Sequence, residues 1–94
     1  MIEQLTLDTR KALNMTLAEF ADALNEQMPA KVTLAAVHHW QTGRRKPRIS
    51  LVELMVRVYP EGDWRHEFAA SMIDALRAES LSEFIAQEAV AEPN

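Results

Sequence analysis

The chain has 94 residues, of which 48% are hydrophobic and 26% are charged, a balance typical of one globular domain. It contains no cysteine, which excludes disulfides and thiolate metal sites, and its first residues lack the basic start and apolar run of a signal peptide. No apolar stretch approaches the roughly 20 residues of a membrane span, so we expect a cytoplasmic protein without a membrane partner.

The net charge of −4 hides an uneven distribution of charge along the chain. Residues 31–57 contain six Lys and Arg and one Glu, whereas residues 58–94 contain eight acidic and two basic side chains. A chain divided in this way can present a basic face to phosphate groups although its overall charge is negative. The overall charge therefore does not exclude nucleic acid as a partner.

Two Gly and four Pro, with no run of β-branched residues, favour helices joined by short connections. The first helix is expected over about residues 3–13. Its buried side chains are expected to be Leu5, Ala12 and Leu13. The second helix is expected to begin at a capping box formed by Thr16 and Glu19, and its apolar spacing extends it to Met28.

A third helix is expected from Leu34 to about Gln41. Thr33 is its natural N-cap, and Gly43 can supply the left-handed residue that ends it. Residues 44–48, Arg-Arg-Lys-Pro-Arg, are expected to be extended, because the residue before a proline is disfavoured in helix. The pattern therefore predicts a helix followed directly by a basic segment.

Two further capping boxes are expected to begin helices in the second half of the chain. Ser50 with Glu53 predicts the start of a fourth helix, which ends before a Pro-Glu-Gly turn, and Asp63 is expected to cap a fifth. Ser80 with Glu83 predicts a sixth, but no Gly or Pro separates it from the fifth. The prediction is an all-α protein of five to six short helices.

Residues 15–24, 37–47 and 50–54 resemble the phage-repressor (Cro-like, XRE-type) helix-turn-helix family. The elements of the family pattern stand in this chain as Met15-Thr16, Val37, Trp40, Gly43 and Pro47. The resemblance implies a lambda-repressor-like DNA-binding domain with a helix-turn-helix formed by helices 2 and 3. Residues 1–62 would form its core, and residues 63–94 a helical extension that packs on the core or dimerises.

The resemblance also implies a DNA-binding site, because the third helix of this family lies in the major groove. The implied contacts to base edges come from Leu34, Ala35, His38 and His39. The implied contacts to phosphates come from Thr33, Thr42, Arg44, Arg45, Lys46 and Arg48. Val37 and Trp40 are expected to point inwards and to hold the helix against Phe20 and Ala21.

The chain departs from the family pattern at three places. Leu17 stands where the family commonly has a Gln that contacts phosphate, and Asn25 stands where a Gly usually closes the second helix. About six additional residues, 26–31, separate the second and third helices, where the usual turn has about three or four. We interpret them as one more turn of the second helix, followed by a longer connection.

The function implied by the resemblance is sequence-specific binding of double-stranded DNA by a transcriptional regulator, either a repressor or an antitoxin-type autoregulator. A homodimer is expected, because two linked half-site readers share one binding event. The candidate interface consists of Phe68, Met72, Leu76, Phe84 and Ile85, which alternatively close the core of a monomer. A toxin or another regulator is a candidate protein partner. The alternative function is a protein-interaction adaptor that keeps the fold without DNA binding.

The sequence lacks the groupings that catalysis requires. It contains no Ser/His/Asp set, no Gly-rich phosphate loop and no pair of acids in an apolar setting, so neither an enzymatic activity nor a cofactor is expected. His38 and His39 are adjacent and would point about 100° apart on a helix, which does not allow them to chelate one ion. No metal site is predicted.

Overall fold

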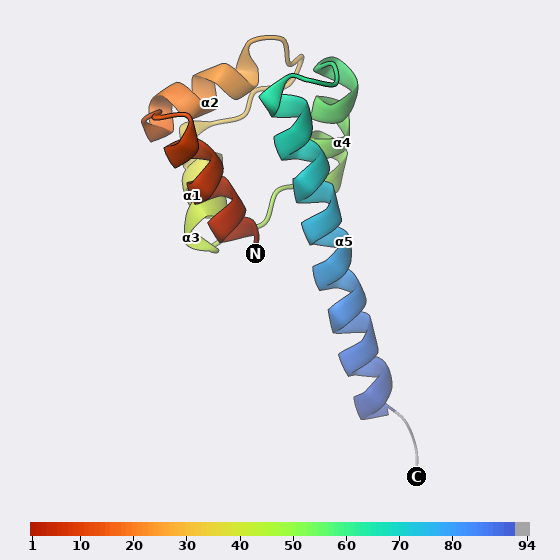
Figure 1. Cartoon of the computed structure of the whole chain (residues 1–94). Helices are drawn as coiled ribbons and strands as arrows, with labels where there is room; N and C mark the ends of the chain where they lie inside the picture. Colours follow the sequence, from red (N-terminus) through yellow and green to blue (C-terminus); the bar gives the residue numbers. More distant parts are fainter. Residues whose placement is uncertain (92–94) are drawn as a thin grey trace.

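The computed structural model of the protein describes residues 1–91, without the side chains of residues 84 and 86–91. Within this part of the chain there are five helices and no strand, so the all-α prediction is confirmed (Figure 1). The helices are α1 (Ile2–Ala12), α2 (Leu17–Asn25), α3 (Leu34–Thr42), α4 (Ile49–Val58) and α5 (Trp64–Ala91). None of the described helices combines the length and the apolarity needed to cross a membrane.

The starts of α2 and α3 follow the predicted capping rules. The Thr16 hydroxyl accepts the N–H of Glu19 at 3.1 Å, and the Glu19 carboxylate accepts the N–H of Thr16 at 2.8 Å. The Thr33 hydroxyl accepts the N–H of Ala36 at 3.0 Å, and α3 ends at Gly43 with a left-handed φ of 77°. The capping predictions for both helices are confirmed.

The other two predicted capping boxes do not form. Ser50 and Glu53 lie inside α4, whose N-cap is Arg48. Ser80 and Glu83 lie in the interior of α5, which is one continuous helix of 28 residues rather than two helices. The preceding Leu-Arg-Ala-Glu run consists of strong helix formers, so the chain does not leave the helix before Ser80 and the box has no helix start to cap.

The second helix ends at Asn25, three residues earlier than predicted. The Asn25 side chain donates to the carbonyl of Val32 and accepts the N–H of the same residue. This pair of hydrogen bonds joins the two ends of the connection formed by residues 26–31. The additional residues therefore form a closed loop instead of the extra helical turn that we expected.

The C-terminal end of α2 is also held by residues that follow α4. The Tyr59 hydroxyl donates to the Leu24 carbonyl at 2.8 Å and accepts the N–H of Gln27 at 3.1 Å. The Arg65 guanidinium donates to the Ala23 carbonyl at 2.9 Å and lies 4.0 Å from the centre of the Tyr59 ring. The last carbonyls of a helix lack intrahelical partners and carry partial negative charge, so these donors stabilise the end of α2.

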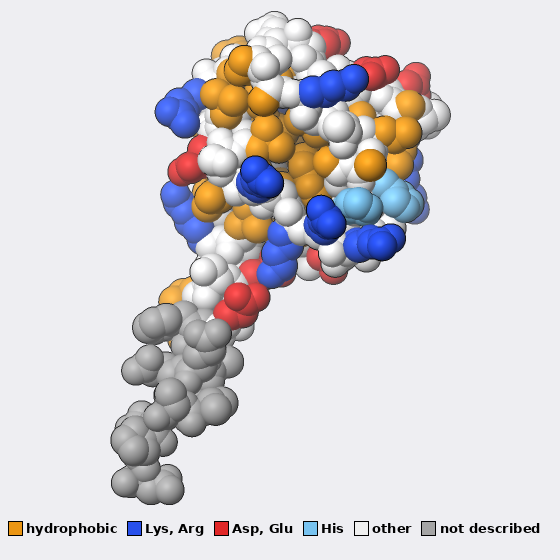
Figure 2. Space-filling view, turned by 180° about the vertical axis from the view of Figure 1, so that it is seen from behind, with side chains coloured by type: hydrophobic (Ala, Val, Ile, Leu, Met, Phe, Trp, Pro, Cys, Tyr) orange, Lys and Arg blue, Asp and Glu red, His pale blue; other side chains and the backbone are white. Residues whose placement is uncertain are grey.

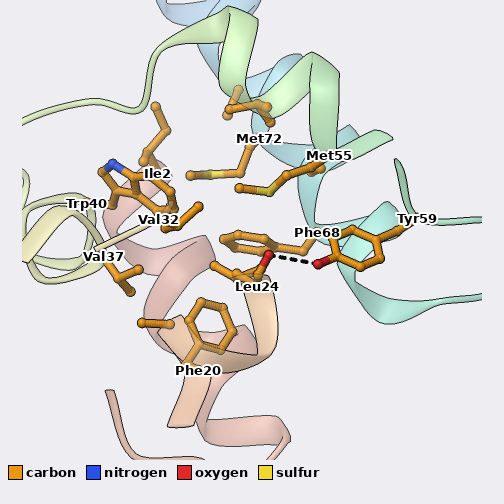
Figure 3. Close-up of a cluster of buried hydrophobic side chains, with 14 residues drawn as sticks. Ile2, Phe20, Leu24, Val32, Val37, Trp40, Met55, Tyr59, Phe68 and Met72 are labelled. Carbon is orange, nitrogen blue, oxygen red and sulfur yellow. Dashed lines mark hydrogen bonds between the residues drawn. The ribbon is translucent and has the colours of Figure 1, made fainter. Parts of the chain in front are cut away.

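One hydrophobic core joins all five helices (Figure 3). Its largest fully buried apolar side chains are Ile2, Phe20, Leu24, Val32, Val37, Val52, Met55, Tyr59 and Met72. The Phe20 ring lies 5.3 Å from the rings of both Trp64 and Phe68, which brings α2 against the start of α5. Burial of one such side chain contributes about 1.5–3 kcal/mol, so this core fixes the position of helices that are too short to be stable alone.

The buried face of α1 differs from the predicted face. Ile2 and Thr6 are fully buried, whereas Leu5 and Leu13 are half-buried and Ala12 is exposed. Burial of Thr6 is tolerated because its hydroxyl donates to the Ile2 carbonyl at 2.8 Å. No side-chain cap marks the start of α1, so the sequence did not indicate that the helix begins at Ile2 or that Ile2 belongs to the core.

The last helix, α5, packs in the core with its first half and extends beyond the other four helices with its second half (Figure 1). Phe68 and Met72 belong to the core of the monomer, so their predicted place in a dimer interface is wrong. Leu76 is half-buried and packs against the same core. Ile85 is exposed, and the side chain of Phe84 lies outside the described residues.

Candidate nucleic-acid interface

The third helix presents one face to the core and the other to solvent. Val37 is 0% exposed and Trp40 is 3% exposed, as predicted for the inward face. On the opposite face, Leu34 is 50% exposed, and Ala35 and His38 are exposed as well. The first half of α3 therefore carries an accessible surface of two small or branched apolar side chains and one imidazole.

His39 lies at the edge of this surface and is half-buried. Desolvation, followed by the charges of Arg44, Arg45 and His38, lowers the pKa of His39 below its ordinary value of 6.5. The lowered pKa favours the neutral imidazole, which offers one hydrogen-bond donor and one acceptor. A neutral imidazole of this kind suits the mixed donors and acceptors of a base edge.

The C-terminal end of α3 is turned by Gly43. Its φ of 77° is a conformation that L side chains rarely adopt, and a Cβ atom at this position would lie 3.0 Å from Cγ of Glu3. The N–H groups of Gly43 and Arg44 both donate to the His39 carbonyl. The turn directs the following residues away from the helix axis and brings the basic segment, residues 44–48, beside α3.

One further contact holds α3 against α1, and another lies within α3 itself. Arg10 on α1 donates through Nε to the Gln41 side chain at 2.9 Å and through Nη1 to the Met15 carbonyl at 3.1 Å. The Thr42 hydroxyl donates to the His39 carbonyl at 3.4 Å. Sequence reasoning missed the Arg10–Gln41 contact, because 31 residues separate the partners and neither residue type signals the other.

The cations of the basic segment have different environments. Arg44, Arg45 and Arg48 are exposed, and no described carboxylate forms an ion pair with any of them. Lys46 is different, because its Nζ lies 3.4 Å from a carboxylate oxygen of both Glu79 and Glu83 on α5. The hydrogen bond to Glu83 and the charge of Glu79 raise the pKa of Lys46. Among the described residues, the three arginines are therefore the exposed cations of the segment that have no ion-pair partner.

A hollow of about 350 Å³ lies between α3, the basic segment and the start of α4. It is lined by Thr33, Ala35, Ala36, His39, Trp40, Arg45, Lys46, Pro47, Arg48 and Leu51. Six of the ten site residues expected from the sequence line this hollow, while Leu34, His38, Thr42 and Arg44 lie outside it. Figure 2 shows the histidines with Lys and Arg side chains beside them and hydrophobic side chains on the same face.

The position expected to contact phosphate from the start of α2 lacks a polar side chain. Leu17 is half-buried and packs against the core, so it adds to stability rather than to the accessible surface. No three His, Asp or Glu side chains of the described residues are grouped as metal ligands would be. The chemistry of this face is therefore that of exposed guanidinium groups, imidazoles and small apolar side chains.

Comparison of the chain with protein-family models, with curated proteins and with solved structures finds no match. What this face binds is therefore inferred from its own chemistry. Guanidinium groups recognise phosphates with two parallel hydrogen bonds, and small apolar side chains fit the methyl group of thymine. The combination suits a ligand that offers phosphates at its margin and base edges at its centre.

Proposed function

We propose that the protein is a sequence-specific double-stranded DNA-binding transcriptional regulator, with α2 and α3 as its helix-turn-helix. The observation that carries the proposal is the exposed face of α3 followed directly by three exposed arginines. An α-helix with its side chains is about 10–12 Å in diameter, which fits the roughly 12 Å width of the major groove. The inward anchors Val37 and Trp40 leave the opposite face free to enter the groove.

Each side chain then has a role that its position supports. Leu34 and Ala35 contact thymine methyl groups, and His38 and His39 form hydrogen bonds with base edges. The contacts to phosphates come from Thr33, Thr42, Arg44, Arg45 and Arg48. Thr33 uses its hydroxyl oxygen to cap α3, which leaves the hydroxyl proton for a phosphate near the positive end of the helix.

The proposal includes a homodimer, because a half-site reader gains affinity when two copies bind one operator. Leu81 and Ile85 lie four residues apart on α5 and are 59% and 58% exposed. Residues with this spacing share one face of a helix, and both lie in the second half of α5, which extends beyond the other helices (Figure 1). An isologous contact between two α5 helices would bury this face in a dimer. The dimer would act as a repressor or as an antitoxin-type autoregulator.

The test is fluorescence anisotropy with duplexes selected from a random library and with DNA from upstream of the gene, at several salt concentrations. We expect sequence-specific binding that weakens steeply with salt, because the arginines release counterions from phosphates. Arg45→Glu should weaken binding to all sequences alike, whereas His39→Ala should change the preference at one base position. Absence of DNA affinity at low salt would contradict the proposal.

A second candidate function is a protein-interaction adaptor that keeps this arrangement of helices without binding DNA. The exposed apolar side chains of Leu34, Leu81 and Ile85 favour it, because such residues are typical of protein interfaces. The same assay distinguishes the two functions. Tight binding of a protein such as a toxin, together with no DNA affinity at low salt, would support the adaptor.

A further inference from the structure

The contact between the basic segment and α5 involves Lys46, Glu79 and Glu83, and we call it the Lys46 clasp. The Lys46 Nζ lies 3.4 Å from each of the two carboxylates, which come from positions 33 and 37 residues later in the chain. The side chain of Lys46 is 49% exposed, and those of Glu79 and Glu83 are 29% and 66% exposed. Figure 2 shows acidic side chains near Lys and Arg where the globule meets the extended part of α5.

The carboxylates reach Lys46 because of the register of α5. Ala75 is buried in the core, and Glu79 and Glu83 follow at intervals of four residues, so all three lie on the same side of the helix. The buried face of α5 thus continues out of the core as an acidic face beside the basic segment. Glu79 Oε2 is buried without a hydrogen-bond partner in the described structure. An unpaired buried oxygen costs free energy.

Lys46 also lines the hollow beneath α3 together with Arg45 and Arg48. A carboxylate and a phosphate offer the same kind of anionic acceptor to an ammonium group. Two carboxylates already neutralise the charge of Lys46, so a DNA phosphate must displace them or approach against their negative charge. We propose that Glu79 and Glu83 are intramolecular competitors of DNA phosphate for Lys46, and that the Lys46 clasp lowers the DNA affinity of the protein. This inference rests on the proposed function, and it assigns to α5 a regulatory role at the same site.

The test compares the wild type with the E79Q/E83Q variant in DNA-binding titrations over a range of salt concentrations. One additional phosphate contact steepens the slope of log affinity against log salt by about 0.9. The gain of the variant over the wild type should therefore grow about 3.5-fold between about 200 and 50 mM salt. Gln keeps the length and the helix propensity of Glu, and circular dichroism verifies that both proteins are folded.

Two controls separate the clasp from general repulsion between acidic residues and DNA. In a K46Q background, the E79Q/E83Q change should no longer raise DNA affinity or change the salt slope. Asp74→Asn removes an exposed acidic charge from the same helix, five residues before Glu79, and should leave the salt slope unchanged. An equal gain with and without Lys46 would overturn the inference, as would an unchanged slope in E79Q/E83Q. If neither the wild type nor E79Q/E83Q binds DNA, the proposed function fails, and this inference fails together with it.

Discussion

The hydroxyl of Tyr59 holds the C-terminal end of α2, and its removal should weaken the start of the connection between α2 and α3. Tyr59→Phe keeps the buried ring, which is 1% exposed, and removes only the oxygen. That oxygen donates to the Leu24 carbonyl at 2.8 Å and accepts the N–H of Gln27 at 3.1 Å. The substitution therefore breaks two hydrogen bonds at the C-terminal end of α2 without creating a large cavity.

The loss of stability depends on whether the two former partners of the hydroxyl can form hydrogen bonds with water instead. The bond to the Leu24 carbonyl is buried, so that group would lose a partner that water cannot easily replace, at about 1–3 kcal/mol. Gln27 is exposed, so its N–H can turn to water, and the loss there is about 0.5–1 kcal/mol. We expect the free energy of unfolding to fall by about 2–3 kcal/mol, which lowers the Tm of a domain of this size by about 10–20 °C.

Urea and thermal unfolding followed by circular dichroism measure this loss. Thr6→Val is the matched control, because it removes another buried hydroxyl, but the Ile2 carbonyl that this hydroxyl contacts lies inside α1. That carbonyl keeps its helical N–H, so the control should cost less than about 1 kcal/mol. A loss below about 0.5 kcal/mol for Tyr59→Phe would refute the view that its hydroxyl holds the end of α2.

Two further predictions concern the turn after α3 and the effect of acid. Gly43→Ala and Gly62→Ala should each cost about 1–2 kcal/mol in urea unfolding, because both glycines have a positive φ. Gly43→Ala should cost more, since its Cβ would lie 3.0 Å from Cγ of Glu3, whereas a Cβ at Gly62 has no neighbour within 4 Å. Equal costs would show that the Glu3 side chain moves aside freely. Hydrogen bonds from Arg65 lower the pKa of Asp63 below its ordinary value of 3.8, so the native state binds fewer protons than the unfolded state near that pH. This stabilisation is present above pH 3.8 and is lost as the pH falls through the lower, folded pKa. The urea midpoints of the wild type and of Asp63→Asn should therefore differ near neutral pH and converge in strong acid. A difference that stays constant with pH would contradict this linkage.

Local rules predicted the parts of the fold that depend on neighbouring residues. Thr16 with Glu19, Thr33 and Gly43 were correctly assigned because each acts within four residues of its own position. The same rule failed for Ser80, since a capping box has meaning only where the chain is not already helical. A pattern alone does not show whether the preceding residues have left the helix.

Contacts between residues that are distant in the chain could not be predicted from the sequence. The end of α2 is set by Tyr59 and Arg65, which follow α4, and no local pattern signals that they reach back. In the candidate site, helical periodicity correctly separated the inward Val37 from the outward His38. It could not show that Lys46 is already paired, because its partners lie on another helix more than thirty residues away.

The loop closed by Asn25 has a consequence for how this chain tolerates change in length. Its two ends meet at the paired hydrogen bonds with Val32, and its tip, residues 29–31, is exposed. Doubling the length of a flexible loop costs only about 0.6 kcal/mol when its ends stay fixed. Residues inserted at this tip would therefore leave α3 in place, and a tag or a fluorescent reporter can be added there with little disturbance.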